Sequence, residues 1–369
     1  MQSAWVDQPI GLFNAAAGTQ VITNRLVEIH MKNTRVETVR GAVPADALGT
    51  AYIHEHVFVL SPDVLTNYPS LWNEEERVAD AVARLRALKD RGVDTIADPT
   101  VLGLGRDIRR VARVNDQVDL NIVPATGLYT YNGVPLFFYF RGPGTLLGGD
   151  EPMVDTFVEN ITTGIAGTSI KAAFLKCAIE EALTPGVERV MKAIAEAHKR
   201  TGVPIMVHTS ASHRTGLVTQ QVLAGEGVDL GKVLIAHAGD TTDMDYLHKL
   251  IDAGSYIGMD RFGLDPILPT DQRVATIAKL AAEGLADRMM LAHDASCHMD
   301  WFPPEVYQSL PDWRFTFIHD TVLPALAQAG VTEKQISTML IDNPRTFLTA
   351  GNAALRALDE RPHESIERR

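Results

Sequence analysis

The sequence predicts an α/β fold, a (β/α)8 TIM barrel, from the alternation of its apolar segments. Eight strand-like runs follow one another from residue 48 onward, with helical patterns between them. The runs span residues 48–58, 93–100, 120–127, 170–178, 203–210, 232–239, 255–260 and 288–294. Continuously apolar strands that alternate with helices indicate parallel strands covered by helices, and eight such units favour a closed barrel over an open sheet.

Two of the connecting segments show the helical pattern clearly. Residues 75–92 and 184–202 place Ala, Leu and Val at helical spacing, with charged residues between them. The second segment also has Thr184 as an N-cap, Pro185 at the first helical position and Gly202 at the C-terminal end.

An open, doubly wound sheet is the structural alternative, and its nucleotide-binding form requires the pattern G-x-G-x-x-G after a strand. Residues 103–108 contain Gly103 and Gly105, but Ile108 stands where the third glycine belongs. The sequence therefore does not favour a dinucleotide-binding fold.

Composition and charge narrow the class of protein. Apolar residues make up 46% of the 369 residues and charged residues 22%, which fits a globular enzyme with a sizeable core. The net charge of −12 and the lack of a basic, aromatic-rich run argue against a nucleic-acid partner. No apolar run reaches the length of about 18 residues that a membrane span needs, and no secretory leader is evident. We therefore expect no membrane partner, a cytoplasmic location and reduced thiols at Cys177 and Cys297.

The chain divides into one large domain and two short ends. We expect the barrel over residues 34–350, an N-terminal extension over 1–33 and a charged C-terminal tail over 351–369. The tail is expected to form a short helix that fades into disorder. The first 30 residues match no barrel element, and whether they belong to the natural protein stays open because Met31 offers a second start.

His54-Glu55-His56 is the strongest local signal for metal binding. Side chains alternate along a strand, so the two histidines share one side while Glu55 faces the other. We expect both imidazoles to point into the barrel.

Four further candidates stand at the same end of later strands. Lys176, His208 and His237 each close a strand-like run, and Asp294 ends the eighth. The carboxyl ends of barrel strands carry the active site in this fold. This recurrence predicts that all six side chains meet at one barrel mouth.

Lys176 requires its own explanation, because a buried ammonium beside histidines would repel a cation. Burial and nearby positive charge lower the pKa of an amine, and a neutral amine reacts with carbon dioxide to give a carbamate. Such an anion offers one oxygen to each of two metals. We expect Lys176 to be carboxylated.

The strand-end motifs, taken in order, resemble those of the phosphotriesterase family of the amidohydrolase superfamily. The closest resemblance is to the phosphotriesterase-like lactonases, and it covers roughly residues 34–348. The motifs are HEHVF, DPTVLGLGRD, ATGLYTY, FLKCA, VHTSA, HAGDT, GMDRFG and LAHDASC.

This resemblance implies a binuclear metal centre on an amidohydrolase-type barrel. His54, His56 and Asp294 would hold the more buried metal, and His208 and His237 the more exposed one. The carboxylated Lys176 and a hydroxide would bridge the two divalent ions. We expect the two ions to be zinc, with cobalt, iron and manganese as alternatives. Asp294 would also carry the proton from the hydroxide towards the leaving group.

The resemblance further implies substrate-binding roles. Tyr129 and Arg261 follow the third and seventh strands, and we expect them to act in catalysis and substrate binding, with Arg261 supporting Tyr129. The stretch from 295 to 313 contains Trp301 and Phe302, which we expect to line an apolar channel.

Two features leave the channel and its acyl-chain preference open. Ser296 stands where close lactonases often have cysteine. The apolar cluster 136–140 could extend the channel or could pack on the barrel.

The predicted function is hydrolysis of lactone rings, with N-acyl homoserine lactones first and consequent degradation of quorum signals. We expect slower hydrolysis of organophosphate triesters and aryl esters at the same metals. We expect the protein to be a homodimer. A dedicated phosphotriesterase and a noncatalytic, metal-stabilised binding barrel are the alternatives. A dihydroorotase is disfavoured because Val57 and Phe58 follow His56 where an arginine would be expected.

Overall fold

Eight short parallel strands form the barrel, as the sequence predicts. The structure is a computed structural model that describes residues 34–351. The barrel strands are β3 (Ala51–Tyr52), β5 (Thr95–Asp98), β6 (Asn121–Gly127), β7 (Phe174–Ala178), β8 (Ile205–His208), β9 (Val233–Ala236), β10 (Tyr256–Met259) and β11 (Met289–Leu291). Neighbours in the chain are neighbours in the sheet, and all these pairs are parallel.

The barrel closes where the first and last strands meet. The amide of Ile53 lies 3.4 Å from the carbonyl of Leu291, and that of His56 donates to the carbonyl of Ala295 at 2.8 Å. Beyond this point β4 (His56–Val59) pairs in parallel with β12 (Ser296–Met299). The closure holds the His54 and Asp294 segments against each other.

β12 is a difference from the sequence prediction, which treated residues 295–313 as one long loop. Four residues that alternate half-buried and buried form this strand, a pattern too short to stand out in the sequence. The stretch also contains α11 (Pro304–Ser309). It is therefore more regular than expected.

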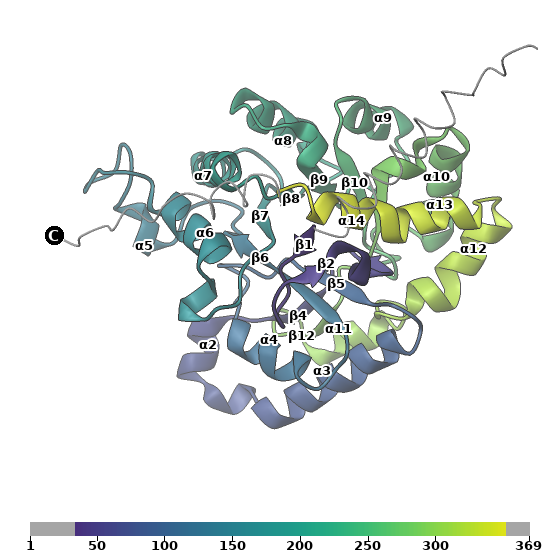
Figure 1. Cartoon of the computed structure of the whole chain (residues 1–369), viewed down its shortest axis with the longest axis horizontal. Helices are drawn as coiled ribbons and strands as arrows, with labels where there is room; N and C mark the ends of the chain where they lie inside the picture. The colour runs from purple at the N-terminus through teal and green to yellow at the C-terminus, as the bar shows by residue number, and fades with distance from the viewer. Residues whose placement is uncertain (1–33, 352–369) are drawn as a thin grey trace, which may run out of the picture.

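Helices surround the strands in Figure 1. The α-helices are α2 (Pro62–Asn67), α3 (Glu74–Lys89), α4 (Ile108–Asn115), α5 (Leu136–Tyr139), α6 (Pro152–Thr162), α7 (Pro185–Thr201), α8 (Thr215–Gly225), α9 (Met244–Asp252), α10 (Thr270–Ala282), α11 (Pro304–Ser309), α12 (Leu323–Gln328), α13 (Glu333–Ser337) and α14 (Asn343–Leu348). Two π-helical turns, η6 (Ile318–Val322) and η7 (Thr338–Asp342), precede α12 and α14. A small antiparallel pair, β1 (Arg35–Val36) with β2 (Val43–Pro44), precedes the barrel.

The helix signals of the sequence act as predicted. In α7 the Thr184 side chain accepts the amide of Val187, and Gly202 ends the helix in the left-handed conformation with φ 75°. In α3 the apolar residues lie on one buried face that includes Leu85. Truncating Leu85 to alanine would cost about 2–5 kcal/mol, the usual range for a buried leucine.

Two predictions of the sequence concern residues outside the described range: the extension over 1–33 and the tail over 351–369, of which only Gly351 is described. Among the described helices, none combines the length and apolar character needed to cross a membrane. Cys177 and Cys297 are both free and buried, in agreement with the expectation of reduced thiols.

Candidate metal centre

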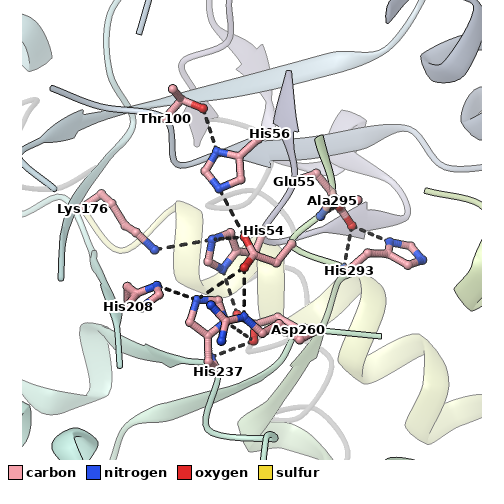
Figure 2. A network of polar contacts seen from close by, with 12 residues as sticks. His54, Glu55, His56, Thr100, Lys176, His208, His237, Asp260, His293 and Ala295 are labelled. Carbon is pink, nitrogen blue, oxygen red and sulfur yellow. Dashed lines mark hydrogen bonds and ion pairs between the residues drawn. The ribbon is translucent and has the colours of Figure 1, made fainter. Parts of the chain in front are cut away.

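The six residues singled out from the sequence meet at the carboxyl end of the barrel, and Figure 2 shows five of them converging. The Nε2 atoms of His54 and His56 lie 3.2 and 3.3 Å from Oδ1 of Asp294. On the other side of the centre, Nε2 of His237 lies 2.9 Å from Nδ1 of His208. Nζ of Lys176 lies 3.5 Å from Nε2 of His54. Strand geometry therefore brings together six nitrogen and oxygen donors from five barrel units.

Two of these residues have an unusual backbone. His237 and Asp294, each just after a strand, have φ values of 64° and 53°. Residues other than glycine rarely adopt this left-handed region, and such strain concentrates at functional sites. The amide of His237 donates to Oδ1 of Asp260 at 2.7 Å, which holds this conformation.

Each imidazole of the cluster has a partner on the nitrogen that faces away from the centre. Asp260 contacts Nδ1 of His54 at 2.9 Å and Nδ1 of His237 at 3.1 Å. Nδ1 of His56 contacts Thr100 at 2.7 Å. Glu180 lies 2.5 Å from Nε2 of His208. Such outer contacts fix ring orientation in metal sites, and here each leaves the other nitrogen for a metal.

A second grouping, His54 with His237 and Asp260, also places donor atoms within 4.8 Å of one another. Both carboxylate oxygens of Asp260 are, however, already paired with the Nδ1 atoms of these histidines. We interpret Asp260 as a support for the ligands. The grouping of His54, His56 and Asp294 is the better metal site because its donors face an open cavity.

The protonation states of the donor side chains also favour a metal site. Burial lowers the pKa of His54 and of His208 to about 4, so both imidazoles are neutral near pH 7 and hold a lone pair. Burial opposes ionisation of Asp294, but its contacts with the surrounding imidazoles and the charge of Arg261 outweigh it and hold the pKa of this carboxyl well below its ordinary value. The donors are thus in the protonation states that a divalent cation requires.

Lys176 is fully enclosed among these donors. Its side chain is 1% exposed, and burial lowers its pKa to about 8. Within the described chain its one hydrogen-bond contact is with His54. The amine therefore faces the cluster without a paired carboxylate.

Two carboxylates hold the guanidinium of Arg261 at the edge of the catalytic cavity. Its Nε donates to Asp294 at 3.0 Å and one terminal nitrogen donates to Asp240 at 3.0 Å. Among the described residues no hydrogen bond joins Arg261 to Tyr129, and the expectation that Arg261 supports Tyr129 stays a prediction. Asp240 is in turn held by the buried Arg273 at 2.6 Å.

Tyr129 stands over the exposed side of the cluster. Its hydroxyl lies 2.5 Å from that of Tyr131 and 3.4 Å from Nδ1 of His208. Burial raises its pKa well above the ordinary value, so the hydroxyl keeps its proton. It is available as a donor to a substrate oxygen.

The cluster opens into a cavity of about 260 Å³. Trp301 and Phe302 line it as expected, together with Leu264 and Ile267 from the segment after β10. The apolar cluster 136–140 does not line it; four of its five side chains are exposed and only Phe138 is buried. The alternative in which that cluster extends the channel therefore finds no support.

Sequence reasoning missed the supporting residues: Asp98, Thr100, Glu180, Asp240, Asp260 and Tyr131. Several also follow strands, as in the segments DPT and GMD, and that position was the available signal. Their contacts depend on pairs far apart in the chain, such as the 206 residues between His54 and Asp260.

Comparisons with known proteins agree with this geometry. The phosphotriesterase family model matches residues 34–348. A phosphotriesterase homology protein of Mycobacterium tuberculosis is 54% identical over 313 residues, which cover 84% of this chain and 96% of that protein. An aryldialkylphosphatase of Saccharolobus solfataricus is 41% identical over 314 residues, covering 84% of this chain and 98% of that protein.

A solved structure shows the same family resemblance. The phosphotriesterase from Mycobacterium tuberculosis superposes with a TM-score of 0.84 at 54% identity, covering 85% of this chain and 98% of that one. The chain is thus a metal-dependent hydrolase, and it belongs to the phosphotriesterase family.

Proposed function

We propose that this hydrolase opens lactone rings, with N-acyl homoserine lactones as the preferred class and degradation of quorum signals as the consequence. Slower hydrolysis of organophosphate triesters and aryl esters at the same centre is part of the proposal. The shape of the cavity beside the metal-binding residues carries it.

The cavity is small and largely walled by aromatic and aliphatic groups. Its volume of about 260 Å³ is bounded on the rim by Tyr129, Trp301 and Phe302. A lactone is flat at its carbonyl and carries one apolar tail, so it needs room in one plane and along one direction. A triester carries three arms around a tetrahedral phosphorus and needs room on several sides. The walls therefore favour the lactone.

The chain's own residues have distinct roles in such a reaction. Two divalent ions, for which the donors described above fit, would supply an activated water and polarise the carbonyl. Asp294 accepts a proton during attack and passes it to the leaving alkoxide. Arg261 holds Asp294 in place at 3.0 Å. The hydroxyl of Tyr129, beside His208, orients the lactone ring of the substrate.

We also propose that Lys176 is carboxylated and that zinc fills the centre. An amine whose pKa is lowered to about 8 by burial is partly neutral near pH 7, the form that combines with carbon dioxide. Imidazole and carboxylate donors suit zinc, and cobalt, iron or manganese would also accept them.

A dedicated phosphotriesterase is the second candidate. It is favoured by the name of one relative, an aryldialkylphosphatase at 41% identity. A noncatalytic binding barrel is less consistent with a ligand set that includes a proton carrier, Asp294.

The decisive experiment compares kcat/KM for an acyl homoserine lactone and an aryl dialkyl phosphate with one preparation of defined metal content. We expect the lactone to have the higher value and long-tailed lactones to exceed short-tailed ones. A higher kcat/KM for the triester would favour a dedicated phosphotriesterase over a lactonase. Stoichiometric metal without turnover of either substrate would favour the binding barrel.

We further propose a cytoplasmic homodimer. Large apolar side chains are exposed on α5 and on the loop that follows it, among them Leu136 at 74% and Leu146 at 82%. Apolar surface of this kind marks interfaces. Light scattering after size exclusion, on wild type and on a Leu136→Glu/Leu146→Glu double variant, tests this; a monomeric wild type would contradict it.

A further inference from the structure

A second cavity lies behind the segment that follows the last barrel strand. Its volume is about 760 Å³, compared with about 260 Å³ for the catalytic cavity. None of the six metal-binding candidates lines it. The two cavities share Met299, Phe302, Leu310 and Trp313, so these four side chains form a common wall between them.

One part of this cavity is apolar and open to solvent. Val64 and Leu71, on and after α2, are 45% and 60% exposed, and Phe302 is 44% exposed. Pro304 and Tyr307 of α11 continue the apolar lining. Covering such side chains with an apolar chain would release about 25 cal/mol for each Å² removed from water.

The lining also contains cationic side chains. Arg77 and Arg84 lie seven residues apart on α3, which places both on the helix face that borders the cavity. Arg84 is paired with Asp80 at 2.8 Å, and Arg314 is paired with Asp320 at 2.7 Å. Arg77 forms no ion pair with any described residue, and its Nε is shielded from solvent without an acceptor.

A second orphaned polar atom lines the same cavity. Oγ of Ser296, on β12, is shielded from solvent and has no partner in the described chain. The carboxylate in the lining, Asp300, is occupied by the amide and the hydroxyl of Ser61 at 2.7 and 3.0 Å. The cavity therefore offers unused donors without a free acidic acceptor, and buried polar groups normally find partners.

We propose that this cavity binds an amphiphilic carboxylate of medium chain length. Its carboxylate would pair with Arg77 and accept from Ser296, and its chain would lie along Val64, Leu71 and Phe302. The volume falls within the range of about 300–1,000 Å³ that small-molecule sites occupy. Because the wall is shared, the bound molecule also supports the side chains that bound the catalytic cavity. The proposal does not depend on which ester the centre cleaves.

The test is calorimetric titration of the metal-loaded enzyme with octanoate. Excess acetate is present throughout, because this short carboxylate competes at the metals and cannot fill the apolar part. We expect saturable binding of one octanoate and much weaker binding of 1-octanol, which lacks the charge. Arg77→Gln should weaken binding about tenfold or more, the effect of losing a charge-assisted hydrogen bond.

Two further variants distinguish loss of the proposed binding site from loss of the folded structure. Arg86→Gln on the same helix is the matched control, since Arg86 donates to the carbonyl of Gln117 and does not line the cavity. It should bind octanoate as wild type does. Leu71→Glu changes an exposed side chain and should repel the carboxylate, giving weaker binding. Equal binding by wild type, Arg77→Gln and Leu71→Glu would overturn the proposal, as would equal affinity for octanoate and 1-octanol. A crystal structure with octanoate at the metals alone would overturn it too.

Discussion

Glu55 accepts hydrogen bonds from the backbone amides on both sides of Asp294. Its Oε1 lies 2.8 Å from the amide of His293, and its Oε2 lies 3.1 Å from that of Ala295. Figure 2 shows Glu55 directed away from the neighbouring histidines towards this segment. Asp294 itself has a left-handed backbone with φ 53°. The carboxylate that faces away from the metal centre thus holds the ligand loop in a conformation it would not otherwise prefer.

Glu55→Gln should therefore weaken metal binding without removing a ligand. The amide side chain cannot accept all three N–H groups that Glu55 now binds, including Nδ1 of His293 at 2.6 Å. Leaving a buried N–H group without an acceptor costs about 1–3 kcal/mol. Elemental analysis after dialysis against a weak chelator should show lower metal content, and the thermal midpoint should fall. Glu188→Gln, a change at a half-buried residue of α7 that pairs with Lys192, is the control; equal metal retention by both variants would contradict this role for Glu55.

Asp260→Asn should have a larger effect than Thr100→Val. Asp260 holds His54 and His237 at once, whereas Thr100 holds only His56. Loss of an outer partner usually lowers metal affinity by about 10–100-fold for one ligand. Competition with a chromophoric chelator measures both variants. The order would be reversed if Asp260 contributed nothing to the orientation of the two rings.

The sequence was sufficient for the parts of the site that follow from strand periodicity. His54, Glu55 and His56 alternate as a strand requires, and the structure places Glu55 opposite the histidines. Side chains that end successive parallel strands must share one edge, so Lys176 and His208 could be placed together without coordinates.

The remaining features depend on tertiary contacts that leave little local signal. The left-handed backbone of His237 and Asp294 occurs at residues that do not usually adopt it. The pairing of Arg261 with Asp240 and Asp294 joins residues that follow three different barrel strands, so no local pattern in the sequence indicates it. The short strand β12 forms only because β4 lies beside it.

The metal-free protein should lose stability as the pH falls from about 6.5 to about 4. Burial lowers the pKa of His54 and His208 to about 4 in the folded state, while both would titrate near 6.5 in the unfolded chain. The unfolded state therefore binds more protons in this window, so stability decreases as the pH falls. Each histidine contributes a slope of at most about 1.4 kcal/mol per pH unit. Urea titrations at several pH values, on protein freed of metal by a chelator, measure the free energy of unfolding. His208→Asn should reduce its slope against pH. A flat profile would show that these imidazoles are not buried neutral.

Lys176→Ala should lower both metal occupancy and turnover, because the proposed carbamate would no longer compensate two cations. Added formate, acetate or propionate should restore part of the metal content if a carboxylate-like bridge is what was lost. Lys176→Met fills the space without an anion and serves as the comparison, and it should not respond to the acids. An active, metal-loaded wild type whose electron density shows an unmodified amine would refute the carbamate.

Trp301→Ala should change which lactones are cleaved while leaving metal content unchanged. Trp301 lines the catalytic cavity 6.2 Å from the ring of Tyr129, centroid to centroid, and is 41% exposed, so it contacts substrate space but no ligand. Removing the indole widens the rim on the side where an acyl tail would leave the centre. We expect kcat/KM to fall about tenfold for long-tailed lactones, which lose apolar contact worth about 1–3 kcal/mol, and to change little for short-tailed ones. Tyr68→Ala, at an aromatic residue 63% exposed and outside this cavity, is the matched control and should leave the profile intact. Steady-state kinetics over a series of tail lengths measures the effect. A uniform loss across the series would assign Trp301 to the fold of the loop, because only a tail contact makes the loss depend on length.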